Sequence, residues 1–189
     1  MAITKQLLEN FKQTTEERWE SKHIDDAIYG FQIVPGTRWN PGLNEEEIAQ
    51  YANALGVQFP DDFRTFLGVM NGTNLPTLNV YGRSNEPTRE GIGAYSYPRD
   101  IDFVKHLIRE VGEGSEELRV TMAEDGFDLP KDCGFVPIYG HRYLLCTSDL
   151  RRSVVLSIAT PSDAIVYGET LEEYLIREFL EQSPLTLET

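Results

Sequence analysis

Apolar side chains recur every three to four residues in two adjacent segments, and this spacing predicts two short helices. In the first segment, Asn44 stands where its side chain accepts from a free N–H group of the first turn, and Glu47 completes a capping box. Gly56 occupies the place of a left-handed C-terminal residue. The inward stripe of this helix consists of Ile48, Tyr51, Ala52 and Leu55.

The second segment begins at Pro60, whose fixed φ suits the start of a helix, and is followed by two acids. Asp61 and Asp62 place negative charge at the positive end of the helix dipole. Asn71 and Gly72 tolerate the left-handed conformation, so we expect the helix to stop there. Its buried face is predicted to contain Phe59, Phe63, Phe66, Leu67 and Met70, and no catalytic residue lies within it.

The rest of the N-terminal half contains weaker signals. Apolar positions from Ile3 to Trp19 follow a helical period and predict a leading helix. Pro-Gly turns flank Trp39, so we expect an extended connection over 30–43 in which Trp39 closes the edge of the core. Further along, we expect a strand over 78–81, a loop over 82–93 and a helix over 98–111.

The C-terminal third changes to an extended pattern. Four β-rich runs cover 135–139, 143–146, 153–158 and 164–167, and short turns join the first to the second and the third to the fourth. Thr170 then caps a closing helix. We therefore predict an α+β fold with N-terminal helices packed on a mainly antiparallel sheet of about five to six strands and a closing C-terminal helix.

The ordered set of an acidic helix, a Phe-Pro helix, an Asn-Gly stop and a Phe-Val-Pro-Ile strand resembles the SUKH superfamily. The motif residues are Trp39, Phe59, Pro60, Asp61, Phe63, Phe66, Leu67, Asn71 and Gly72. Phe59 and Phe63 stand where that family more often has Leu and Tyr, which are size-conserving exchanges. The resemblance implies a leading helix and connector over 1–35, a SUKH-like domain over 36–182 and a tail over 183–189.

Composition fits one soluble domain, because 40% hydrophobic and 25% charged residues lie close to globular averages. No apolar run is long enough for a membrane helix, and the first residues are unlike a signal peptide, so we expect a cytoplasmic protein. Cys133 and Cys146 are expected to be reduced packing residues. No zinc ligand set is present, and no cofactor is predicted.

The charge balance is strongly acidic: 17 Lys and Arg stand against 31 Asp and Glu, which gives a formal net charge of −14. A field of this sign repels nucleic acid and anionic membranes, and it raises encounter rates with a basic partner. Plain solubility is the alternative interpretation. The sequence leaves the oligomeric state open.

Candidates for chemistry are few. His141 lies beside Arg142 with Asp149 nearby in sequence, which would suit an acid/base or phosphate-binding pair. A polar turn residue facing water is the favoured interpretation, because no nucleophile motif accompanies it. Asp125, Asp128 and Asp132 lack the spacing of a calcium loop, and no serine-hydrolase motif occurs. We predict a protein without enzymatic activity.

The densest acidic region lies between residues 110 and 132, where acids far outnumber bases. We expect partner binding at Glu113, Glu116, Glu117, Glu124, Asp125 and Asp128. The alternative is a solvated loop and helix face. The first interpretation describes a surface that presents carboxylates to lysine and arginine side chains of another protein.

The resemblance sharpens this expectation, because bacterial SUKH proteins include immunity proteins that neutralise polymorphic toxins. It implies stoichiometric binding of a basic toxin domain, with Tyr95 and Tyr97 as anchors or as core residues. The alternative is a regulatory interaction module similar to fungal regulators of cell-wall synthesis. A third class, a small-molecule sensor or hydrolase, would use His141 and Arg142.

Overall fold

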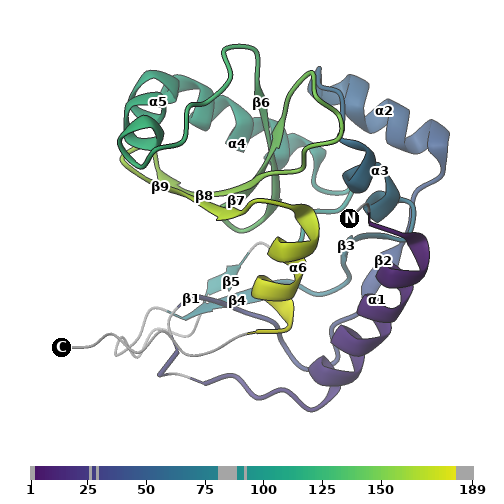
Figure 1. Ribbon diagram of the computed structural model, residues 1–189. Helices are drawn as coiled ribbons and strands as arrows, with labels where there is room; N and C mark the ends of the chain where they lie inside the picture. Colours follow the sequence, from purple (N-terminus) through teal and green to yellow (C-terminus); the bar gives the residue numbers. More distant parts are fainter. Residues whose placement is uncertain (1–2, 26, 29, 81–88, 92, 182–189) are drawn as a thin grey trace.

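The structure is a computed structural model that describes residues 3–25, 27–28, 30–80, 89–91 and 93–181 (Figure 1). The predicted tail over 183–189 lies outside these residues. The helices are α1 (Lys5–Glu20), α2 (Glu45–Leu55), α3 (Asp61–Leu67), α4 (Ile101–Glu113), α5 (Ser115–Glu124) and α6 (Leu171–Phe179). The strands are β1 (Gly30–Gln32), β2 (Trp39–Pro41), β3 (Met70–Thr73), β4 (Thr77–Val80), β5 (Arg89–Gly91), β6 (Gly134–Tyr139), β7 (Arg142–Cys146), β8 (Val155–Thr160) and β9 (Asp163–Gly168).

The α+β class is confirmed, and the described strands form three antiparallel sheets. The largest has four strands in the order β6-β7-β8-β9, so it is a simple meander. Both predicted hairpins are present, since Tyr139 pairs with Arg142 and Thr160 with Asp163. The remaining strands form a three-stranded sheet, β1-β4-β5, and a two-stranded sheet, β2-β3. The main sheet therefore has four strands where about five to six were expected, and the other described strands belong to two small sheets.

The four-stranded sheet separates two layers of helices, with α4 and α5 on one side and α6 on the other (Figure 1). Alternation along β7 explains this arrangement, because successive side chains of a strand point to opposite faces. Tyr143 and Leu145 join the cluster that contains residues of α4 and α5, while Leu144 and Cys146 join the cluster with α1, α3 and α6. Both faces of the sheet are thus buried.

Trp39 lies at the centre of the larger cluster, with 4% of its surface exposed. Its ring centroid is 5.3 Å from that of Trp19, 5.3 Å from Phe179, 5.9 Å from Phe66 and 6.1 Å from Phe11. Such aromatic pairs add to the hydrophobic gain from burial. The predicted core position of Trp39 is confirmed, and α1 packs into the same core as α3 and α6.

The second predicted helix ends earlier than expected. Helix α3 stops at Leu67, and residues 70–73 form strand β3, in which Thr73 pairs with Trp39. The prediction of a helical stop at Asn71 is therefore wrong. Asn71 instead holds another segment, since its side-chain oxygen accepts from the N–H of Tyr97 at 2.9 Å and its amide donates to the Tyr97 carbonyl at 2.6 Å. Pairing with a distant strand overrides the local helical spacing.

One helix and one strand were not predicted from the sequence. Ser115–Glu124, which carries much of the predicted acidic surface, is a regular helix. The prediction of a loop over 82–93 is wrong at Arg89–Gly91, because these residues form strand β5 and pair with Thr77–Asn79. Residues 82–88 and 92 lie outside the described part of the chain.

A buried ion pair joins α6 to the sheet. Nε of Arg142 donates to a carboxylate oxygen of Glu178 at 2.9 Å, and the two side chains are 15% and 9% exposed. A second guanidinium nitrogen donates to Ser157 Oγ at 2.7 Å, and the guanidinium carbon lies 3.8 Å from the ring centroid of Tyr167. The charges are therefore satisfied within the fold, as buried charges must be.

Gly72 is confirmed in the left-handed region, with φ of 66°. A Cβ atom there would lie 2.6 Å from the carbonyl oxygens of both Ala94 and Tyr95. Gly126 has a similar φ of 82°, but a Cβ atom there would meet nothing within 4 Å. The two glycines thus share the backbone requirement and differ in the space beside them.

We expect Gly72→Ala to be much more destabilising than Gly126→Ala. The left-handed conformation costs about 1–2 kcal/mol for a residue with a Cβ atom, and this cost applies at both sites. At Gly72 the displaced backbone adds a further cost of about 1–3 kcal/mol. Urea unfolding of both variants measures the difference, and equal loss of stability would contradict the close approach of the two carbonyls to Gly72.

For the ion pair, we expect Glu178→Gln to lower the free energy of unfolding by about 3–5 kcal/mol, because Arg142 would remain buried without its partner. The double variant Arg142→Met with Glu178→Leu should recover most of this loss, since it removes both charges together. Thermal and urea unfolding test the pair. A double variant no more stable than the single one would show that the ion pair is not the cause.

Candidate protein-binding surface

Helix α5 has one face in the core and one in solvent. Leu118 and Met122, four residues apart, are fully buried against the sheet, whereas Val120 is 60% exposed. Glu116 and Glu117 lie in the first turn, where carboxylates interact favourably with the helix dipole. Glu116, Glu117, Val120 and Glu124 therefore lie on the exposed side of a helix whose other side is packed in the core.

Every residue of the predicted acidic surface is exposed. Glu113 ends α4, Glu116, Glu117 and Glu124 belong to α5, and Asp125 and Asp128 follow it. Within the part of the chain that the structure describes, none of these six carboxylates forms an ion pair. No ion pair within the described residues therefore offsets the acids of this surface.

Arg119 is the one basic residue of α5, and its guanidinium binds the backbone of the segment that follows the helix. It donates to the backbone carbonyls of Leu129 at 2.9 Å, Pro130 at 3.1 Å and Lys131 at 3.2 Å. The positive charge is therefore used to hold the segment after α5 against the helix. It does not neutralise the outward carboxylates.

An apolar residue lies within the acidic face. Val120 is four residues after Glu116, three after Glu117 and four before Glu124, so helical geometry places all three carboxylates around it. We did not identify Val120 from the sequence. The signal that could have found it is the helical period itself, because a valine two residues from both Leu118 and Met122 must face away from the core.

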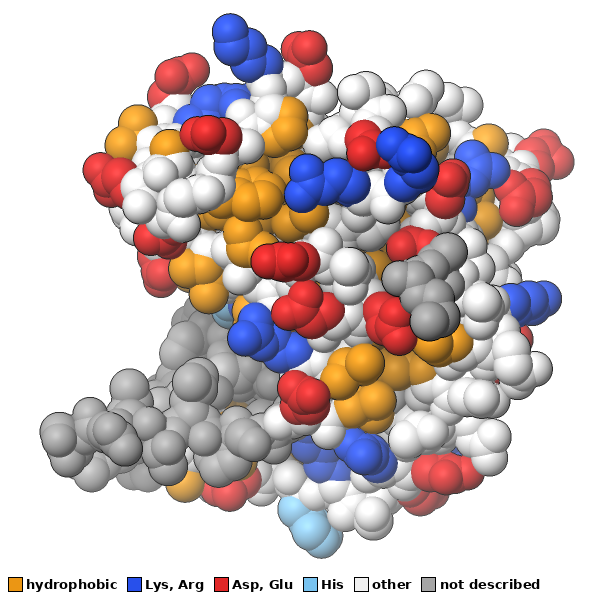
Figure 2. All heavy atoms as spheres, viewed as in Figure 1, with side chains coloured by type: hydrophobic (Ala, Val, Ile, Leu, Met, Phe, Trp, Pro, Cys, Tyr) orange, Lys and Arg blue, Asp and Glu red, His pale blue; other side chains and the backbone are white. Residues whose placement is uncertain are grey.

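Beside this face lies an apolar depression that we call the loop groove, of about 240 Å³. Figure 2 shows hydrophobic side chains gathered on the upper part of the molecule in this view, with acidic and basic side chains around them. The loop groove is lined by Phe127, Asp128, Pro130, Leu145, Thr147, Ser148, Asp149, Arg152 and Val154. Sequence reasoning missed it, because its two walls are about 20 residues apart in the chain.

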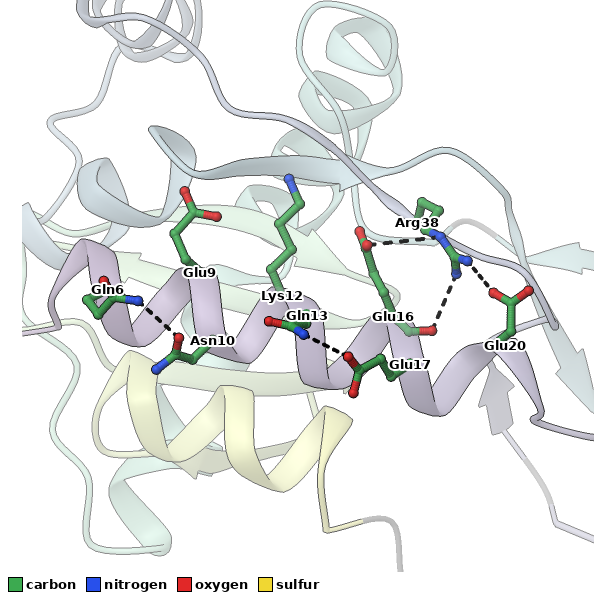
Figure 3. A pocket seen from close by; sticks show the side chains of 9 residues that line it. All are labelled: Gln6, Glu9, Asn10, Lys12, Gln13, Glu16, Glu17, Glu20 and Arg38. Carbon is green, nitrogen blue, oxygen red and sulfur yellow. Dashed lines mark hydrogen bonds and ion pairs between the residues drawn. The ribbon is translucent and has the colours of Figure 1, made fainter.

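A second acidic region follows α1, in a wide groove of about 620 Å³ lined by polar residues of that helix and by Arg38. Arg38 lies between Glu16 and Glu20 and forms ion pairs with both (Figure 3). Glu16 also accepts from the N–H of Trp39 at 2.9 Å. These carboxylates are used to fix the segment that carries Trp39, so they differ from the unpaired acids of α5.

The structure does not assemble the candidate acid/base site of His141 and Arg142. Arg142 is committed to Glu178 and Ser157. The sequence predicts that His141 faces water, whereas the structure buries it in part. Its ring centroid lies 5.6 Å from that of Phe31. Burial and the neighbouring Arg142 lower the pKa of His141 from its ordinary value of 6.5 to about 4, so the ring is neutral at pH 7.

The prediction that Tyr95 anchors a partner is wrong, because only 7% of its surface is exposed. Its hydroxyl donates to the Gly140 carbonyl at 2.8 Å. Tyr97 is half-buried and stacks on Tyr51 at 4.7 Å between ring centroids. Both tyrosines therefore pack against other residues of the fold, which agrees with the alternative prediction that they are core residues.

The remaining candidates have structural positions. Most residues of the family motif are buried, with Asp61 exposed at the start of α3: Trp39, Phe59, Pro60, Phe63, Phe66, Leu67, Asn71 and Gly72. Cys133 and Cys146 are free thiols, the first partly buried and the second buried. Among the described residues, no group of three or more His, Cys, Asp or Glu could hold a metal ion. In the same part of the chain, no helix is long and apolar enough to cross a membrane.

The lowered pKa of His141 makes stability depend on pH. Between about pH 6.5 and 4 the unfolded chain binds a proton that the folded protein does not, so stability should fall as the pH falls through this window. His141→Gln should remove this part of the pH dependence, whereas His23→Gln, at an exposed position, should not. Urea unfolding across the window provides the test, and identical pH profiles for wild type and His141→Gln would contradict it.

Comparison with known proteins gives one family. The model of the SMI1 / KNR4 family (SUKH-1) matches residues 42–177, which include α2 to α5 and most of α6. Neither the curated proteins nor the solved structures contain a match to this chain. The matched range leaves α1 outside and includes helices α2 and α3, the four-stranded sheet and the acidic face of α5. The chain therefore belongs to the SMI1 / KNR4 family (SUKH-1).

Proposed function

We propose that this protein is a non-enzymatic binding protein that neutralises a basic toxin domain by forming a stoichiometric complex. One observation carries the proposal: six exposed carboxylates on and beside α5 have no ion-pair partner among the described residues. A fixed surface of one charge sign attracts and orients a partner of the opposite sign. Family membership supports the proposal, because SUKH proteins include toxin-immunity proteins.

The mechanism needs only geometry and charge. Helix α5 is fixed by Leu118 and Met122, so the backbone that carries its acids is in place before the partner arrives. Preorganised contacts avoid the entropy cost of ordering side-chain-bearing segments on binding. Val120 supplies an apolar contact inside the acidic rim, which is the arrangement of many interface centres. Bound in this way, the protein covers the surface with which the toxin would contact its substrate.

The alternative is a regulatory module similar to the fungal members after which the matched family is named. Partner number and complex strength separate the two. An inhibitor of one toxin should form a tight one-to-one complex, whereas a regulatory module should bind several proteins more weakly. Capture from the lysate and secreted fraction of the source organism, followed by mass spectrometry, identifies which case holds.

We expect charge reversal on α5 to slow association with the captured partner. The test variant replaces four exposed acids by lysine: Glu116, Glu117, Glu124 and Asp125. Its association rate constant should fall by about 10-fold or more at low salt, and the difference should shrink as salt rises. Stopped-flow or surface-plasmon measurements give the rates, and circular dichroism checks that the variant is folded.

A matched control changes the net charge equally on other elements. It replaces four exposed acids of α1, α2 and the turn before α6 by lysine: Glu9, Glu17, Glu46 and Glu169. This control should retain most of the wild-type rate. Equal slowing of both variants would show that net charge alone governs association, and unchanged rates for the α5 variant would contradict the proposed surface.

A further inference from the structure

The loop groove has an apolar floor beneath a polar rim. Leu145 of β7 and Val154 are each 3% exposed and form the floor, while Phe127 and Pro130 belong to the wall that follows α5. Small concave sites with apolar linings and a few polar groups are where proteins accept side chains or ligands. The volume of about 240 Å³ is that of a site for one side chain.

Both walls of the loop groove are fixed by hydrogen bonds. On one side, Arg119 donates to three successive backbone carbonyls, those of residues 129 to 131. On the other side, the N–H of Asp149 donates to Thr147 Oγ1 at 3.2 Å, and the N–H of Arg152 donates to the Asp149 carbonyl at 3.2 Å. A groove with such walls exists before an occupant arrives, so little ordering is needed on binding.

The charges on the rim indicate the sign of the occupant. Asp128 is exposed and makes no ion pair with any described residue, and it continues the acidic surface from Glu124 and Asp125. Asp149 is already engaged by Arg151 at 3.2 Å, and hydrogen bonds from the backbone and side chain of Arg151 lower the pKa of Asp149. The carboxylate of the lining that is free for a new contact is therefore that of Asp128. Arg152 also lines the loop groove and is the opposing cation, while Glu124 and Asp125 before Asp128 add negative charge on that side.

We propose that the loop groove receives an apolar side chain of the partner protein, with a neighbouring lysine or arginine of the partner placed on Asp128. This inference rests on the proposed function, since it assumes a basic protein partner. It adds a specific anchor to the acidic face. The acids attract and orient the partner, and the loop groove selects a partner that carries an apolar side chain next to a basic one.

A probe of this chemistry tests the site without a partner. Benzamidine carries an aromatic ring and a cation, benzamide is its neutral counterpart, and benzoate carries the opposite charge. Titrated into the ¹⁵N-labelled full chain, benzamidine should shift amide signals of the loop groove and bind about two- to fivefold more tightly than benzamide. Benzoate should bind more weakly than either. The reverse order, with benzoate tightest, would assign the occupant to Arg152 and overturn the proposal.

Two test variants and one control separate the contribution of shape to probe binding from that of charge. Ser148→Trp places a large side chain in the loop groove and should abolish the local shifts, while Ser162→Trp, on the exposed β8–β9 turn, should leave them unchanged. Asp128→Asn should reduce benzamidine affinity to that of benzamide. Shifts that persist in Ser148→Trp, or shifts spread over the whole surface, would overturn the proposal.

The captured partner distinguishes failure of this inference from failure of the proposed function. Ser148→Trp should weaken the complex by about 10-fold or more through faster dissociation, as loss of a central anchor does. Ser162→Trp should not. If the partner binds Ser148→Trp as tightly as wild type but responds to charge reversal on α5, the loop groove is not an anchor and the proposed function stands. If the partner binds both the Ser148→Trp variant and the α5 charge-reversal variant as it binds wild type, both this inference and the proposed function fail.

Discussion

The contact on which the rest of this structure depends is the burial of the Trp39 indole among aromatic side chains from three helices. The indole N–H donates to Thr15 Oγ1 of α1 at 2.9 Å, so the polar atom is satisfied where water is excluded. The ring also contacts Phe66 of α3 and Phe179 of α6. One residue of strand β2 thereby fixes the relative positions of elements from both ends of the chain.

This arrangement divides the molecule by task. On one face of the four-stranded sheet, aromatic packing and the pair between Arg142 and Glu178 hold α1, α3 and α6. On the other face, α5 packs through Leu118 and Met122, and its acids remain unpaired within the described chain. The charges that stabilise the fold are paired, whereas those we assign to binding are free. This contrast is why we place the partner on α5.

Local signals could be predicted from the sequence, and non-local ones could not. Asn44 and Glu47 form both bonds of the predicted capping box, and Thr170 caps α6 as expected, because each contact spans three residues. The helical expectation fails for residues 70–73, since pairing with β2 some thirty residues earlier decides their conformation. The helical period places Glu178 on the inner stripe of α6 but gives no partner for it. The loop groove likewise joins two segments that only the fold brings together.

The most direct measurement of the central claim is amide hydrogen exchange of the whole protein, free and bound to its captured partner. We expect slower exchange in α5, in residues 125–131 and in residues 147–152, because these segments would be covered. Exchange in α1 and α6, which pack on the opposite face of the sheet, should remain unchanged (Figure 1). Protection centred on the α1 groove, with α5 unaffected, would contradict the account.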